Sequence, residues 1–268
     1  MSPLTWPTSE VRGTIAPDEA HLWAWALEPG AADLSADIEI LDPQERERMQ
    51  RFHFAPDRAR YAVAHANLRR ILGTYLNQPA ASLRFRANGF GKPELAHGAA
   101  WSALHFNLSH SQSIAVLAVA NGLPLGVDVE DVKPIEPEVA DMHFSASERS
   151  ELRALQGDAW LRGFYRCWTR KEAILKAEAS ACFTHSIVSM CLCCRRRRRS
   201  CWGRGSLLVM HGSCTICHRP RGRSGRLQPR NRKPGWSVSA LFLTRSPDRV
   251  LRPLRRLWMT AHCAPSSA

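Results

Sequence analysis

The sequence predicts an α+β protein, and three of its features point to this class. Segments with strand-like and helix-like patterns follow one another in mixed order along the chain. Hydrophobic residues make up 44% of the 268-residue chain, which is enough for an ordinary core. No run of the sequence approaches the roughly 20 apolar residues that a membrane-spanning helix needs.

The chain begins with one predicted strand and two predicted helices. Residues 21–28 (HLWAWALE) alternate and are rich in aromatic side chains, which is typical of a strand. Residues 42–52 and 57–76 show the spacing of amphipathic helices. The second of these helices carries an apolar stripe formed by Tyr61, Ala64, Leu68, Leu72 and Leu76.

A sheet is expected in the middle of the chain. Residues 83–95 (LRFRANGFGKPEL) predict a short strand followed by a glycine-rich turn. Residues 104–111, 114–122 and 125–130 predict three successive strands, and an Asn-Gly turn joins the last two. In the earlier turn, the candidates for a positive φ are Asn88, Gly89 and Gly91.

Two further helices are predicted before residue 179. Residues 145–155 begin with Ser145, and Glu148 follows three residues later, which is a capping-box pattern. Residues 157–178 predict a longer helix, with Asp158 as its expected N-cap.

Charge and cysteine content both change near residue 178. Residues 179–268 hold 18 of the 37 Lys and Arg residues, eight of the nine cysteines and one of the 24 acidic residues, Asp248. The first 178 residues therefore carry a net charge of about −4, so we expect them to bind neither nucleic acid nor a membrane surface. Because the N-terminus lacks the pattern of a signal peptide, we expect a soluble cytoplasmic protein.

Asp128 and Glu130, in GVDVED, lie two residues apart on a predicted strand. Their carboxylates should point to one face, while Val127 and Val129 point to the other. Two adjacent carboxylates are costly to ionise together, and a divalent cation such as Mg²⁺ removes that cost. An edge strand with a solvated acidic face would show the same pattern, so both interpretations stay open here.

Trp168, Glu172 and Lys176 share one face of the last predicted helix, because they are spaced by four residues. Taken alone, Glu172 and Lys176 fit an ordinary surface ion pair. If this face packs beside the strand of Asp128 and Glu130, Glu172 would add a third carboxylate and complete a metal site.

Two shorter motifs carry groups that suit phosphate. Lys92 follows a glycine turn in NGFGKP, and Ser109 and His110 end a strand in FNLSHS. Such side chains can donate hydrogen bonds to phosphate oxygens, although a glycine turn with lysine is often simply a turn. Ser109 and His110 do not suit a nucleophile pair, because neighbours on a strand face opposite ways.

The motifs GKP, FNLSHS, GVDVE and WTRKEAILKAE, in this order and spacing, resemble those of the 4′-phosphopantetheinyl transferases of the larger, surfactin-synthetase-activating type. The resemblance covers roughly residues 20–178. It implies a monomer of two similar halves, residues 1–122 and 123–178, related by a pseudo-twofold axis with coenzyme A between them. Enzymes of this family transfer the phosphopantetheine arm of coenzyme A to a serine of an acyl or peptidyl carrier protein.

The same resemblance implies roles for individual residues. Asp128, Glu130 and Glu172 would hold Mg²⁺ together with the coenzyme A pyrophosphate. Glu172 is also the candidate base for the serine hydroxyl, and Lys176 would contact the phosphates. The residues implied to bind coenzyme A are Arg48, Arg60, Lys92, Ser109 and His110.

The basic segment supports a competing hypothesis, in which the protein binds haem or zinc and nucleic acid. CTICH at residues 214–218 fits the c-type haem attachment pattern, and other cysteines could bind zinc beside the arginines. The haem hypothesis requires export, and the zinc hypothesis lacks a second, regularly spaced ligand pair. We interpret residues 179–268 instead as out-of-frame sequence that is disordered and replaces the last strands of the second half.

Overall fold

The computed structural model describes nine stretches of the chain, and the structural statements below concern them alone. They are residues 14–16, 20–27, 34–89, 91–96, 103–122, 124–178, 207–214, 236–243 and 257–262.

The first sheet has the strand order β4-β5-β1-β9. Its strands are β1 (Ala20–Ala26), β4 (Leu104–Ser111), β5 (Ile114–Asn121) and β9 (Leu257–His262). β5 pairs antiparallel with both β4 and β1, whereas β9 runs parallel to β1. A separate small hairpin consists of β2 (Phe85–Ala87) and β3 (Pro93–Leu95).

The second sheet has the order β6-β8-β7 and is antiparallel throughout. It consists of β6 (Leu125–Asp131), β7 (Leu207–Cys214) and β8 (Trp236–Leu243). The strands β7, β8 and β9 belong to residues 179–268, for which the sequence predicted disorder. The structure thus places three strands in that segment, and one of them is the hydrogen-bonded partner of β6.

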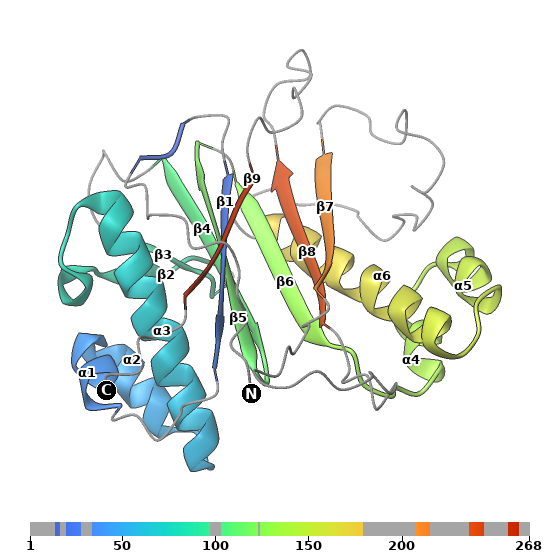
Figure 1. Ribbon diagram of the computed structural model, residues 1–268, viewed down its shortest axis with the longest axis horizontal. Coiled ribbons are helices and arrows are strands. Elements are labelled where there is room, and N and C mark those ends of the chain that lie inside the picture. The colour runs from blue at the N-terminus through green and yellow to red at the C-terminus, as the bar shows by residue number, and fades with distance from the viewer. Residues whose placement is uncertain are drawn as a thin grey trace, which may run out of the picture.

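The helices flank the strands on two sides (Figure 1). On one side lie α1 (Ser35–Ile40), α2 (Pro43–Gln50), α3 (Ala55–Leu76) and the short 3₁₀ helix η1 (Ala80–Ser82). On the other lie α4 (Glu138–His143), α5 (Ala146–Arg153) and α6 (Gly157–Glu178). This mixed arrangement of helices and sheets confirms the α+β class. None of the described helices is long and apolar enough to cross a membrane.

The strands β1 and β5 are buried on both faces. Their alternate side chains therefore pack into two different hydrophobic clusters. One face, which includes Trp23 and Leu117, packs against Leu68 and Leu72 of α3. The other face, which includes Leu22 and Val116, joins Val127 and Val129 of β6 in one cluster. Burial of this second face brings β6 close to the first sheet.

Local sequence signals predicted some structural details correctly and others wrongly. Ser145 and Glu148 form the expected capping box of α5. Asp158 is not an N-cap, because α6 already begins at Gly157 and Asp158 lies in its first turn. Of the three candidates in the glycine turn, Gly91 alone has a positive φ, 76°. Gly122 also has a positive φ, but it links β5 to β6 of the other sheet and closes no hairpin.

Candidate functional site

β4 and β6 come from different sheets and are held together by side chains of β4. Oxygen atoms on alternate residues of β4 accept hydrogen bonds from backbone N–H groups of β6. The pairs are Asn107 with Val127 at 2.8 Å, Ser109 with Val129 at 3.3 Å and Ser111 with Asp131 at 3.1 Å. The polar alternation in FNLSHS therefore aligns β4 with the strand that carries the predicted carboxylates.

Asp128 lies at the centre of this junction and is 3% exposed. Its Oδ1 accepts hydrogen bonds from Ser109 Oγ at 3.0 Å and from Lys176 Nζ at 2.6 Å. Lys176 Nζ also contacts Ser109 Oγ at 3.1 Å. Because Asp128 is buried, the structure excludes the interpretation of this strand as a solvated acidic edge.

The face of α6 that carries Lys176 packs against β6, as the metal hypothesis required. Lys176 forms its ion pair with Asp128 on β6 and not with Glu172 on its own helix. Gly126 makes this close approach possible, since a Cβ there would lie 2.0 Å from the carbonyl oxygen of Ala173. Trp168, two turns before Lys176, stacks on Phe164 in an aromatic cluster that supports the helix.

The acidic groups at this junction have unequal surroundings. Asp128 Oδ2 is buried and has no hydrogen-bond partner among the described residues. Burial raises the pKa of Glu130, and the negative charge of Asp128 raises it further. Both observations suit a cation between these two carboxylates. Glu172 is half-buried and precedes Lys176 by one helical turn.

The three predicted metal ligands do not form a ready-made cluster. Within the described stretches, no three His, Cys, Asp or Glu side chains are grouped closely enough to hold a metal ion. Asp128, Glu130 and Glu172 therefore come from the expected strand and helix but are not gathered around one point.

Basic side chains surround His110 at the end of β4. His110 is exposed while Ser109 is buried, so the two neighbours face opposite ways as predicted. The protein around the ring lowers the pKa of His110, and the positive charges of His65, Lys176 and Arg48 lower it further. His65, Lys176 and Arg48 thus each act electrostatically on His110, and basic groups that converge in this way favour an anion.

Two predicted arginines lie on the helices of the first half. Arg48, on α2, lines a hollow of about 330 Å³ together with Arg51 and Phe52. Arg60, on α3, pairs with Asp57 at 2.8 Å. Its Nε is buried without a hydrogen-bond partner in the described part of the chain. Arg60 thus has one guanidinium donor that no described residue satisfies.

Lys92 lies between three elements. Its backbone belongs to the β2–β3 hairpin, whereas its Nζ donates to the carbonyl oxygens of Leu125 at 2.9 Å and Lys176 at 3.0 Å. Burial lowers the pKa of Lys92 to about 8, and the positive charge of Lys176 acts in the same direction. In this structure the ammonium group thus donates hydrogen bonds to backbone carbonyl groups at the start of β6 and near the end of α6.

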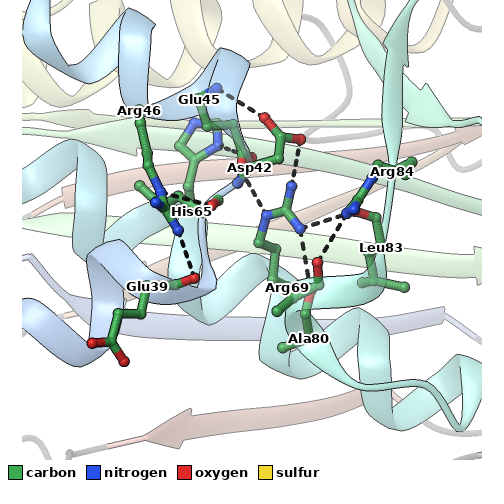
Figure 2. Close-up of polar contacts among 11 residues, drawn as sticks. Glu39, Asp42, Glu45, Arg46, His65, Arg69, Ala80, Leu83 and Arg84 are labelled. Atoms are coloured by element: carbon green, nitrogen blue, oxygen red, sulfur yellow. Dashed lines mark hydrogen bonds and ion pairs between the residues drawn. The ribbon is translucent and has the colours of Figure 1, made fainter.

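A buried ionic network beneath α2 was not predicted from the sequence (Figure 2). Arg69 is fully buried, and its guanidinium contacts Glu45 and Asp42, each at 2.6 Å. Glu45 Oε1 lies 2.9 Å from His65 Nδ1, and Tyr61 stacks on the His65 ring. The network fixes α2, which carries Arg48, on α3, which carries His65. Asp42 and Glu45 also form a capping box, whose spacing was visible in the sequence.

Of the CTICH motif on which the competing hypothesis rests, one residue lies within the described part of the chain. Cys214 ends β7, and residues 215–218 lie outside the described residues.

Comparison with known proteins identifies two matched regions. Residues 24–122 match the family profile described as 4′-phosphopantetheinyl transferase, N-terminal. Residues 124–208 match the profile of the 4′-phosphopantetheinyl transferase superfamily. The second match continues past residue 178, where the sequence motifs had placed the end of the resemblance.

Three relatives carry matching names. The chain is 36% identical to 4′-phosphopantetheinyl transferase HetI of Nostoc sp., over 65% of this chain and 74% of that protein. It is 30% identical to 4′-phosphopantetheinyl transferase Sfp of Bacillus subtilis, over 53% of this chain and 61% of Sfp. It is 29% identical to the human L-aminoadipate-semialdehyde dehydrogenase-phosphopantetheinyl transferase, over 59% and 56% of the two chains. The match thus spans less than two thirds of the latter two proteins.

Proposed function

The chain belongs to the 4′-phosphopantetheinyl transferase superfamily, and on this premise we propose that it transfers the phosphopantetheine arm of coenzyme A to a serine of a carrier protein. The family and the enzyme class expected from the motifs are confirmed by these matches. One observation carries the proposal for this chain: Asp128, buried and paired with Lys176, lies at the junction where β4 meets β6 and α6.

The basic groups would bind the phosphates of coenzyme A. Arg48, His65 and Lys176 each act electrostatically on His110, and Arg60 Nε has no hydrogen-bond partner among the described residues. Hydrogen bonds between cationic donors and phosphate oxygens are stronger than neutral ones, so this group suits a ligand with several phosphates. The hydroxyl of Ser109 lies on the same strand as His110 and within reach of Lys176.

The carboxylates at the junction suit Mg²⁺. Asp128, whose Oδ2 has no hydrogen-bond partner among the described residues, and Glu130, whose pKa is raised, would hold the ion, and Glu172 would have to approach them to join as the third ligand. When bound, Mg²⁺ supplies positive charge that offsets the charge of the pyrophosphate. Lys176 already offsets the charge of Asp128 from the other side.

The reaction requires a base and a stabilised leaving group. The serine oxygen forms a bond to the β-phosphorus of coenzyme A, and the bond to the bridging oxygen breaks, which releases adenosine 3′,5′-bisphosphate. Glu172 takes the serine proton, and Lys176 stabilises the charge that develops on the departing phosphate. We place this reaction in the cytoplasm, in a monomer built of two similar halves.

The direct test is loading of an apo carrier protein. The 268-residue chain is incubated with coenzyme A, Mg²⁺ and an apo acyl or peptidyl carrier protein, and the carrier is weighed by mass spectrometry. We expect a mass increase of one phosphopantetheine, and none on a carrier whose acceptor serine is replaced by alanine.

Calorimetry separates this function from the competing hypothesis. We expect the chain to bind coenzyme A, and we expect Arg60→Ala and His110→Ala each to weaken this binding by about tenfold, as the loss of one charge-assisted contact predicts. Tight binding of nucleic acid together with no binding of coenzyme A would overturn the proposal.

A further inference from the structure

Lys92 joins the first half of the chain to the end of α6. The turn before it is held by two hydrogen bonds with Asn88: the N–H of Lys92 donates to the side-chain Oδ1 of Asn88 at 3.0 Å, and the N–H of Asn88 donates to the Lys92 carbonyl at 2.9 Å. From this turn the side chain reaches the carbonyl oxygens of Leu125 and Lys176. One ammonium group therefore contacts the first residue of β6 and the last turn of α6.

The end of a helix is a favourable place for such a group. The last four carbonyl groups of an α-helix lack partners within the helix, and they form the negative end of its dipole. The carbonyl of Lys176 belongs to this last turn, since α6 ends at Glu178. The ammonium of Lys92 satisfies this acceptor and balances the partial charge around it.

The position of this turn matters for the candidate site. The last turn of α6 contains Lys176, whose side chain contacts Asp128 and Ser109. Gly126, next to Leu125, leaves no space between β6 and α6, because a Cβ there would lie 2.6 Å from the backbone nitrogen of Ala177. Gly126 thus allows the helix to lie directly against β6, and Lys92 ties the same turn to the same end of β6.

We propose that Lys92 is a positioning residue, which holds the last turn of α6 against β6 so that Lys176 faces Asp128, and that its ammonium group is not a ligand of the coenzyme A phosphates. The inference rests on the proposed function for its catalytic consequence. Its structural part, the link between Lys92 and the end of α6, stands independently of any activity.

The test compares three variants in the full 268-residue chain. Lys92→Met keeps the length of the side chain but removes the charge, and Lys92→Arg restores a cation. Lys171→Met is a matched control, because Lys171 also donates to a carbonyl at a helix end, that of His143, and pairs with the buried Glu148.

Hydrogen exchange and kinetics report on different parts of the proposal. We expect Lys92→Met to speed amide exchange in the last turn of α6, and to lower kcat by about tenfold or more, as a small displacement of catalytic groups predicts. The dissociation constant of coenzyme A should change by less than about twofold, because Lys92 is proposed not to contact this ligand. Lys92→Arg should recover part of both losses. Lys171→Met should lower the melting temperature and leave kcat unchanged.

Other outcomes would overturn the inference. If Lys92→Met weakened coenzyme A binding by about tenfold and left exchange in α6 unchanged, Lys92 would be a phosphate ligand. If neither exchange nor kcat changed, Lys92 would be an ordinary turn residue. A parent chain that neither bound coenzyme A nor loaded a carrier would contradict the proposed function, and the exchange experiment would still decide the structural link.

Discussion

The two halves of this protein differ in where their strands find partners. In the first half, residues 1–122, the pairings β1–β5, β4–β5 and β2–β3 lie within the half, and β1 has a further partner in β9, which comes from residues 257–262. In the second half, residues 123–178, β6 has its backbone partner in β8, which comes from residues 236–243. The half that carries Asp128 and Glu172 therefore depends on the segment in which charge and cysteine content change.

The polar interiors of the halves differ in the same sense. The first half contains a closed network, in which Arg69 is matched by Asp42, Glu45 and two backbone carbonyls. At the junction with the second half, Oδ1 of Asp128 is paired with Lys176, whereas Oδ2 has no partner within the described part of the chain. A fully satisfied buried network serves stability, whereas an incomplete one next to a cation suits the binding of a ligand.

The largest effect is expected from the segment after residue 178. Restoring one base near the codon for Ala179 should give a chain that melts cooperatively and loads a carrier about a hundredfold faster or more, because misplacement of catalytic groups by about 1 Å costs a rate of that order. The physical reason is that α6 depends for its position on packed strands, and the strands β7 and β8 come here from the segment that we interpret as out of frame. Circular-dichroism melts and carrier loading of both forms provide the measurement. Equal melts and equal loading would show that residues 179–268 are native as written.

Arg69 tests the closed network of the first half. Arg69→Met should lower the free energy of unfolding by about 3–5 kcal/mol, because it leaves Asp42 and Glu45 buried without their cation. The neighbouring Arg70 is the control, since its pair with Asp37 is partly exposed and Arg70→Met should cost less than about 1 kcal/mol. Urea titrations of the two variants measure the difference. Equal, small losses would contradict the role of the network.

Gly126 tests the close packing of the second half. Gly126→Ala should lower the free energy of unfolding by about 1–3 kcal/mol, because the added methyl meets backbone atoms of α6 that cannot move aside singly. Carrier loading should fall as α6 is displaced. Gly89→Ala is the control, since a Cβ there would meet no atom within 4 Å. A stable and fully active Gly126→Ala chain would show that α6 and β6 are less tightly coupled than the structure indicates.

The smallest effect is the acid dependence of Glu45. Burial raises its pKa, but the hydrogen bond and charge of His65 and the charge of Arg69 outweigh burial, so the pKa is lowered overall. A carboxyl with a lowered folded pKa stabilises the fold above its unfolded pKa of about 4.3, and this contribution disappears as pH falls through the folded value. Glu45→Gln should therefore be less stable than the parent at pH 7, and the gap should narrow below about pH 4. A gap that stayed constant down to pH 3 would contradict this account, and Glu47→Gln, at an exposed position, is the control.

The sequence located the carboxylates and helices because their signals are local. The period-two pattern placed Asp128 and Glu130 opposite Val127 and Val129, and the period-four pattern placed Lys176 on the face that meets β6. The six-residue helices α1 and α4 were missed, because they are too short for a helical period to be recognised.

Contacts between distant segments could not be predicted in this way. Arg69 lies on a helix whose pattern indicates amphipathicity, and nothing local shows that its guanidinium is buried against α2. Lys92 has the pattern of a phosphate-binding turn, and the acceptors of its ammonium lie 33 and 84 residues away. Pairing of β6 with β8 likewise joins residues more than a hundred positions apart, across a change in composition.

The most direct test of the account is the effect of Asp128→Asn on carrier loading. This change keeps the size of the side chain and removes the charge that Lys176 contacts at the junction of the two halves. Mg²⁺-dependent loading, followed by mass spectrometry, should fall by about a hundredfold or more, as expected for the loss of a main electrostatic element of the site. The melting temperature should be recorded beside it, so that the rate refers to folded protein. Undiminished loading by a folded Asp128→Asn chain would remove this junction from the chemistry and contradict the account.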